Sequence, residues 1–180
     1  MHTSSTLDAS ITMTTERPVP RWAVGAARLL PLFALPVCLW RLPFGFGYQM
    51  GLDLAPSPLG VVGGVAYVGT LSLLTELAAF ACRGLVSPWG ETLPHWVPRL
   101  GGRRVPPVAV LVPATAFSLL MLFLLAEWTV CTFHIAGFTD APWTNRWWRL
   151  LASVVSGLFV CSWGLLVPAL TYAFWRRRYR

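Results

Sequence analysis

The sequence has few charged residues and no lysine. Charged residues make up 12% of the chain and hydrophobic residues 56%, whereas soluble domains carry roughly 25% charged residues. This balance excludes an ordinary soluble domain and indicates an integral membrane protein. All 14 basic residues are arginines and the formal net charge is +7. Because the arginines flank apolar runs, we interpret the charge as contact with anionic lipid headgroups and expect no binding of nucleic acid.

The short motifs of several enzyme classes are also missing. There is no C-x-x-C, and the four cysteines fall one in each apolar run, which argues against a thiol oxidoreductase. A Gly-rich phosphate loop, H-E-x-x-H and G-x-S-x-G are absent as well. Glu127, Cys131 and His134 have a helical spacing, but three different ligand types without a second motif are usually coincidental. We therefore expect neither a metal nor a cofactor.

What is present is a set of long apolar runs, each able to cross about 30 Å of hydrocarbon, which takes roughly 20 residues. The four runs are residues 22–46, 59–82, 107–133 and 150–175. The polar, proline-rich stretch 83–106 separates them into two hairpins. Residues 1–20 are rich in Ser and Thr and are predicted to be a disordered tail before a membrane domain at 21–180. The expected fold class is all-α, a transmembrane four-helix bundle.

The arginines also predict the orientation in the membrane. Eleven of the 14 lie in the N-terminal flank, the central loop or the C-terminal tail, and only Arg41, Arg146 and Arg149 lie on the other side. Cytoplasmic loops are enriched in arginine. We therefore expect a multi-pass protein of the cell membrane with loop 83–106 and both termini in the cytoplasm.

Small residues predict which spans lie side by side. Gly60-x-x-x-Gly64 at the start of the second run permits a close helix approach. The fourth run has a similar character, with Ser153, Ser156, Gly157, Ser162 and Gly164. This pattern predicts that the second and fourth spans are neighbours.

Charges inside the spans carry more information, because each costs roughly 2.5–3.5 kcal/mol even on lenient insertion scales. There are four, namely Arg28, Arg41, Glu76 and Glu127. At about 1.5 Å per residue, Arg28 shares a depth with Glu76 in the cytoplasmic half, and Arg41 with Glu127 in the outer half. Each match is a candidate ion pair. A glutamate without such a partner in an apolar cavity holds its proton and can donate it.

The two glutamates differ in their surroundings. Glu76 lies on a stripe of small and polar residues of the second run, together with Ser72 and Ala79. Glu127 has an aromatic setting, since Trp128 is adjacent and Trp40 falls at a similar depth of the first run. Tyr67 is nearer the membrane centre. In the central loop, Trp89 to Glu91 and His95-Trp96 are candidates for a general base, although tryptophans resting on the membrane surface are the favoured interpretation.

Two stretches carry a resemblance to known proteins. GLVSPWGETLPHWVPRLGGRRVPP, together with LPVCLWRLPFGFG at the end of the first span, resembles a group of small four-span membrane proteins of actinobacteria. This resemblance covers roughly residues 22–175. A fainter resemblance is to the bacterial integral-membrane terpene cyclases that close prenylated indole or drimane-type substrates. That resemblance implies that a membrane-embedded acid protonates an isoprenoid double bond.

Such a reaction needs a neutral carboxylic acid in a dry site and aromatic faces that stabilise a carbocation. Glu76 or Glu127 is the candidate acid, and Asp53 or Asp140, in the outer loops, is a candidate for tuning it or removing the final proton. The candidate substrate-binding residues are Trp40, Tyr67 and Trp128.

Two other functions stay open. One is a non-enzymatic membrane protein, an assembly partner or transporter accessory, in which both glutamates are paired with arginines. The other is a four-helix sterol- or amine-binding, isomerase-like protein, in which an intramembrane acid and tryptophans hold a cationic ligand.

Overall fold

The computed structural model describes residues 18–52, 60–92, 104–138 and 142–179. Over these residues the chain forms four long helices, α1 (Arg21–Gly45), α2 (Gly60–Arg83), α3 (Pro107–Thr132) and α4 (Arg146–Tyr179), and no strand. Two short 3-10 helices, η1 (Pro88–Gly90) and η2 (Ile135–Gly137), follow α2 and α3. All four long helices are long and apolar enough to cross a membrane. The predicted all-α fold with four candidate spans is therefore confirmed.

Prolines mark where two of the helices begin. Pro20 precedes α1 and Pro106 precedes α3, both with extended backbone angles, and Pro107 is the first residue of α3. A proline is tolerated at these positions because the first N–H groups of a helix have no acceptor within the helix. The α1 helix ends where Gly47 adopts a positive φ of 87°, which a glycine reaches without a steric penalty.

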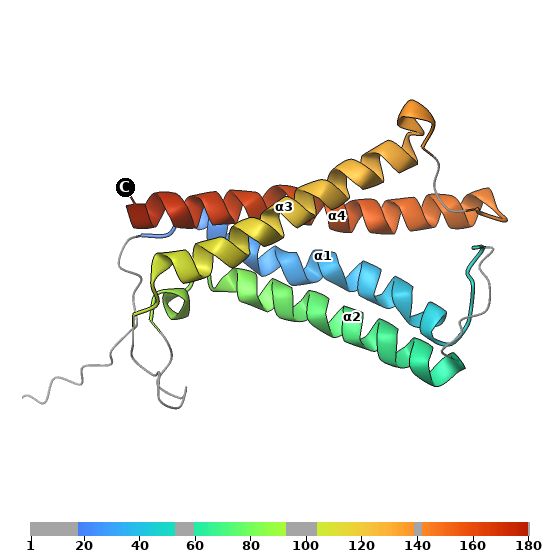
Figure 1. Cartoon of the computed structure of the whole chain (residues 1–180), viewed down its shortest axis with the longest axis horizontal. Coiled ribbons are helices and arrows are strands. Elements are labelled where there is room, and N and C mark those ends of the chain that lie inside the picture. The colour runs from blue at the N-terminus through green and yellow to red at the C-terminus, as the bar shows by residue number, and fades with distance from the viewer. Residues whose placement is uncertain (1–17, 53–59, 93–103, 139–141, 180) are drawn as a thin grey trace, which may run out of the picture.

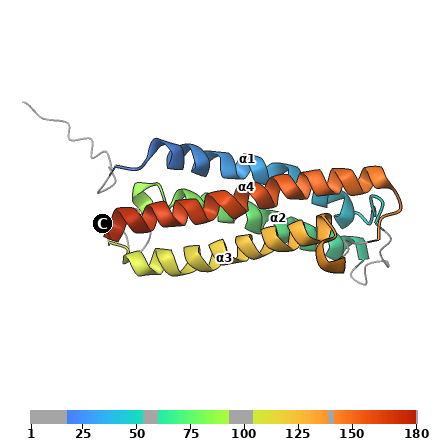
Figure 2. The same ribbon diagram turned by 90° about the horizontal axis from the view of Figure 1, so that it is seen from above.

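The helices pack as two hairpins joined through α1 and α4 (Figures 1 and 2). The α1 helix packs against α2, the α3 helix packs against α4, and α1 and α4 run antiparallel between the two hairpins. The prediction that the second and fourth spans are neighbours is wrong. The glycines of α4 are instead covered by α3, with Gly157 against Trp128 and Gly164 against Leu125. Small residues indicate a close approach without specifying the partner.

Glycines bring α1 and α2 together at one point. A Cβ atom on Gly64 would lie 2.8 Å from the carbonyl oxygen of Gly45, so the two backbones are in direct contact there. Gly60 has nothing within 4 Å of a Cβ position and begins α2 with a positive φ of 62°. Of the predicted Gly60-x-x-x-Gly64 pair, only Gly64 makes the close approach.

We call the end where α1 begins and α4 ends the terminal end, and the end where each hairpin turns the hairpin end. The best-packed core lies between α1 and α4, where Leu30, Trp163 and Phe174 are almost fully buried. The Trp163 indole N–H donates to the Leu30 carbonyl at 3.2 Å and links the two helices. Toward the hairpin end the helices diverge (Figure 1).

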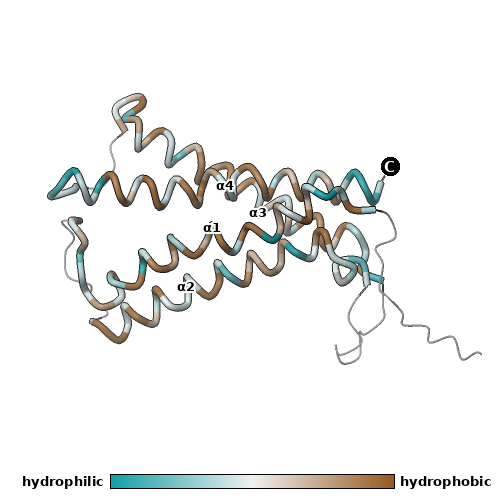
Figure 3. The backbone as a smooth tube through the Cα atoms, turned by 180° about the vertical axis from the view of Figure 1, so that it is seen from behind, coloured by the Kyte–Doolittle hydropathy of each residue, from teal (hydrophilic) through white to brown (hydrophobic). Residues whose placement is uncertain are grey.

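The surfaces and lengths of the helices fit a bilayer. Only 17% of the apolar window of α2 and 11% of that of α3 are buried inside the protein, so large apolar faces are left for lipid. With 34 residues, α4 is about 50 Å long and exceeds the hydrocarbon thickness. Both of its ends are hydrophilic and its middle is hydrophobic (Figure 3).

Candidate functional site

Glu76 lies at the α1–α2 interface without an arginine partner. Its carboxylate oxygen Oε1 is enclosed by protein atoms and has no hydrogen-bond partner, and the same holds for the neighbouring Ser72 hydroxyl. The Cys38 thiol of α1 donates to the Ser72 carbonyl at 4.0 Å and lies within electrostatic range of both Glu76 and Arg41. Among the residues described, Glu76 forms no ion pair.

The predicted pair of Arg28 and Glu76 does not form. The contacts of Gly45 with Gly64 and of Cys38 with Ser72 set the register of the two helices. At about 1.5 Å per residue, this register places Glu76 level with Ala34 and roughly 9 Å from the depth of Arg28. The Arg28 side chain is also exposed on the outside of the bundle. The prediction assumed that the centres of the two spans lie at the same depth. It is wrong because close packing between the helices, rather than the length of each span, sets their register.

The predicted pair of Arg41 and Glu127 does not form either. The α3 helix packs against α4 and makes no extensive contact with α1, so the two side chains lie on helices that do not adjoin. Glu127 is exposed on α3, where the Cys131 thiol donates to its Oε1 at 3.8 Å. Neither glutamate of the spans is therefore held by an arginine in the described structure.

The side chains of Glu127, Cys131 and His134, which have a helical spacing in the sequence, do not come together as a set of metal ligands in the structure. His134 has a left-handed backbone conformation just beyond the end of α3. The Arg149 guanidinium lies 3.0 Å from its Nε2 and 3.2 Å from its Nδ1. Within the described ranges there is no cluster of three side chains of the types that bind metals.

The three predicted substrate-binding aromatics lie in three different places. Trp40 packs against Phe44 and, at 5.9 Å between ring centroids, against Trp148 of α4. Tyr67 is 62% exposed on α2. Trp128 lies on the backbone of α4 at Gly157 and donates its indole N–H to the Ser156 hydroxyl at 3.1 Å.

Several other predictions fall on residues that the structure does not describe. Asp53 and Asp140 lie outside the described residues, as do His95, Trp96 and most of the predicted tail at residues 1–20. The structure therefore adds no geometry for a second acid beside Glu76 or Glu127.

Two cavities adjoin α3. One, of about 700 Å³, lies between α3 and α4 at the hairpin end, and Trp128 forms part of its wall. The other, of about 380 Å³, lies between α2 and α3 and extends from Ala78 and Cys82 to Phe117 and Val167. Glu76 lines neither of them, so the structure does not bring the candidate acid and the candidate aromatics into a common pocket.

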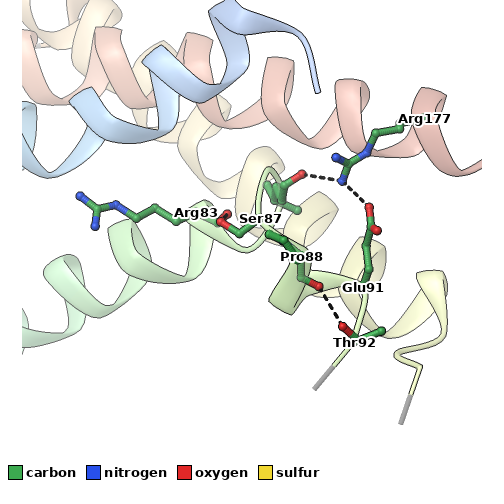
Figure 4. Close-up of polar contacts among 7 residues, drawn as sticks. Arg83, Ser87, Pro88, Glu91, Thr92 and Arg177 are labelled. Carbon is green, nitrogen blue, oxygen red and sulfur yellow. Dashed lines mark hydrogen bonds and ion pairs between the residues drawn. The ribbon is translucent and has the colours of Figure 1, made fainter. Parts of the chain in front are cut away.

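A buried ion pair at the terminal end escaped the sequence analysis (Figure 4). The Arg177 Nη2 atom lies 3.0 Å from Glu91 Oε1, and both side chains are almost fully buried. The same nitrogen donates to the Leu85 carbonyl at 3.2 Å, and the guanidinium lies 5.5 Å from the centre of the Phe174 ring. This pair anchors the segment after α2 to the end of α4.

A periodic signal does distinguish Arg177 from the arginines on either side of it. The buried face of α4 recurs at steps of three and four residues, and Arg177 falls on it whereas Arg176 and Arg178 do not. The residues of that face are Trp163, Val167, Leu170, Phe174 and Arg177.

The terminal end also has local order around η1. The Ser87 hydroxyl donates to the Arg83 carbonyl at 2.6 Å, and the Thr92 hydroxyl donates to the Pro88 carbonyl at 3.4 Å (Figure 4). Glu91 lies beside these contacts and points toward Arg177 of α4. Glu91 is thus held in a buried ion pair with Arg177, and this burial favours a structural role over the general-base role considered from the sequence.

The chain matches no protein-family model, no curated protein and no solved structure.

Proposed function

We propose that the protein is a cyclase of the cell membrane that protonates a prenyl-bearing hydrophobic substrate, with Glu76 as the acid. The observation that supports this most is the Glu76 oxygen Oε1, enclosed by protein atoms without a hydrogen-bond partner or an ion pair in the described structure. Alkene protonation requires a carboxylic acid in a site from which water is excluded, and the enclosed Oε1 atom is the feature of Glu76 that suits this role.

The neighbourhood of Glu76 supports a dry site that opens toward lipid. Ala34 and Ala79 are fully buried nearby, while Leu73 and Leu77 are exposed on the outer side of α2. A hydrophobic substrate would approach sideways from the bilayer. Trp40, which packs against Phe44 and Trp148, lies roughly 9 Å along α1 from the level of Glu76, toward the hairpin end. There its aromatic faces would meet a prenyl chain and stabilise a cation.

The reaction needs no co-reactant. The Glu76 proton moves to one alkene carbon, the π electrons form the new C–H bond, and the cation develops on the more substituted carbon. A second double bond of the substrate attacks this cation and closes the ring. Loss of a proton from the cyclised cation back to the Glu76 carboxylate regenerates the acid, so that product and substrate have the same mass.

A pair of matched variants tests this proposal. The full chain, Glu76→Gln and Glu127→Gln are purified in lipid nanodiscs and incubated with a farnesylated indole. Liquid chromatography with mass detection then follows the appearance of an isomer of unchanged mass. We expect Glu76→Gln to lose about 100-fold or more in rate with unchanged helical content. Glu127→Gln is expected to retain activity, because Glu127 is exposed.

Equal turnover by Glu76→Gln and the wild type would remove Glu76 as the acid. Absence of any isomer with the wild type, together with tight binding of hydrophobic amines, would favour the sterol- or amine-binding alternative instead.

A second candidate function, a non-enzymatic assembly partner, has its own support. Arg28 and Glu127 both lie within candidate spans and are exposed on the outside of the bundle. A charged side chain facing lipid costs roughly 2.5–3.5 kcal/mol, a cost that a charged group of another membrane protein would offset. Site-specific crosslinking from positions 28 and 127 in the native membrane tests this, since crosslinks to lipid alone would contradict it.

We also propose that the terminal end faces the cytoplasm. Arg21, Arg83, Arg104 and the Arg176 to Arg178 run all lie at that end, while Arg146 and Arg149 lie at the hairpin end. This distribution supports the orientation by the rule that cytoplasmic loops are rich in arginine.

A further inference from the structure

The cavity between α3 and α4 combines an apolar wall with two cations. Its volume is about 700 Å³, and Trp128, Val154, Gly157 and Leu158 supply apolar surface. Arg146 and Arg149 line the same cavity. Apolar surface beside two guanidinium groups is the complement of an anionic amphiphile.

Local packing explains why the two helices leave this space. Gly157 lets the Trp128 ring lie on the backbone of α4, since a Cβ atom there would be 2.5 Å from the ring. The indole N–H donates to Ser156 and fixes the ring. Beyond this contact α3 turns away from α4 (Figure 1), and the groove opens between them toward the hairpin end.

The two arginines have different surroundings. Arg149 is half-buried and contacts the His134 ring, which holds its guanidinium beside the groove. Arg146 is exposed, and its side chain makes no hydrogen bond or ion pair with the described part of the chain. Arg146 can therefore bind an external anion without breaking a contact with the described residues.

The length of the groove along α4 suits a lipid. Arg146 and Arg149 lie in the first turn of α4, and Leu158 lies about 18 Å further along the helix at 1.5 Å per residue. Trp147, 75% exposed in the same turn, is typical of the boundary between headgroups and hydrocarbon. In a bilayer, this placement of Trp147 would put the charged end of the groove at the level of the headgroups and its apolar part among the acyl chains.

We propose that this groove binds a phospholipid with a net negative headgroup, with its phosphate on Arg146 and Arg149 and an acyl chain along Trp128 and Leu158. Guanidinium groups bind phosphate oxygens through paired N–H donors. The Thr132 and Ser153 side chains, which also line the cavity, supply hydroxyls between the charged and apolar parts. The site is independent of Glu76, which belongs to the other hairpin.

Native mass spectrometry of the full chain in detergent, titrated with phosphatidylglycerol or phosphatidylcholine, tests the proposal. We expect preferential binding of phosphatidylglycerol. Arg146→Gln/Arg149→Gln should weaken it roughly 25-fold, since each arginine near an anionic surface contributes about fivefold. Ser153→Trp, which fills the groove without changing the charge, should weaken binding of both lipids. The control Arg83→Gln/Arg176→Gln removes two exposed arginines at the terminal end and should change the affinity less than twofold.

Wild-type affinity in both groove variants would overturn the proposal. Loss in the arginine variant with full binding in Ser153→Trp would mean attraction by surface charge, which also overturns a groove site. Soluble glycerol phosphate that competes as well as the whole lipid would identify a free anion as the ligand. Circular dichroism of each variant verifies that the helices are intact, and a failure of the cyclase assay has no bearing on any of these outcomes.

Discussion

At the scale of single residues, the two glutamates Glu91 and Glu76 differ in burial and in their ionic partners. Glu91 forms an ion pair with Arg177 in a nearly solvent-free site, whereas Glu76 is half-buried and forms no ion pair with the described residues. An ion pair removed from water contributes little net stability, but loss of one partner leaves an uncompensated charge. The Glu91–Arg177 pair therefore makes the fold depend on both of its partners, while the lack of such a pair at Glu76 is the basis of the acid role proposed for it.

This difference predicts that Arg177→Met destabilises the protein strongly. Breaking a buried pair costs roughly 3–5 kcal/mol, while Arg176→Met at the neighbouring exposed position should stay within about 0.5 kcal/mol of the wild type. Thermal unfolding in detergent, followed by circular dichroism, compares the two. The double variant Glu91→Gln/Arg177→Met should recover part of the loss. Equal stability of Arg177→Met and Arg176→Met would show that the pair does not hold the segment after α2.

At the scale of helices, a few close contacts decide which helices pair and in what register. The backbone contact between Gly45 and Gly64 aligns α1 with α2, and Trp128 on Gly157 aligns α3 with α4. Each contact involves a glycine because a side chain would occupy the space of the neighbouring helix. The register that follows separates Glu76 from Arg28.

Matched glycine substitutions test this account of the α1–α2 register. A Cβ atom on Gly64 would lie 2.8 Å from a backbone oxygen, while Gly69 on the same helix has open space. Gly64→Ala should therefore be about 1–3 kcal/mol less stable than Gly69→Ala, the usual cost of overpacking, because the gain in helix propensity is common to both. Unfolding in detergent measures the difference. Identical stabilities of the two variants would mean that α1 and α2 can move apart at Gly64 without a loss in the free energy of unfolding.

At the scale of the whole molecule, the packing is uneven along the long axis of the bundle (Figure 1). The α1–α4 core and the Glu91–Arg177 pair hold the terminal end together, while the hairpin end spreads and contains the groove lined by Arg146 and Arg149. Regions with fewer buried contacts open more readily. Ligand binding in this protein is accordingly expected at the hairpin end or from the lipid side.

The orientation of this asymmetric molecule can be measured by cysteine labelling. Tyr179→Cys and Phe138→Cys, each in a chain whose four native cysteines are replaced by alanine, place one exposed thiol at each end. Because arginine-rich ends stay in the cytoplasm, an impermeant maleimide should label Phe138→Cys in intact cells. It should label Tyr179→Cys only after permeabilisation. The reverse pattern would place the groove in the cytoplasmic leaflet and contradict the proposed topology.

The sequence by itself determined the four helices and their approximate limits. Apolar length and proline position are local properties, and a bilayer requires each span to satisfy its own backbone hydrogen bonds. The start of α4 at Arg146, four residues before the predicted span, shows the limit of this reasoning. A helix can extend beyond the hydrocarbon layer, because polar residues at its end continue the helical hydrogen bonds of the backbone.

Only the tertiary structure decided which helices adjoin, which charges pair and where a groove opens. Depth along the membrane predicted two ion pairs that do not form and missed the Glu91–Arg177 pair. Depth in the membrane is only one coordinate of a side chain. Two side chains on different helices make contact only if they also lie on the sides of the helices that face each other and if the helices have the matching register. Those two conditions depend on how the Gly64 and Gly157 contacts bring distant parts of the chain together, and no local pattern in the sequence specifies them.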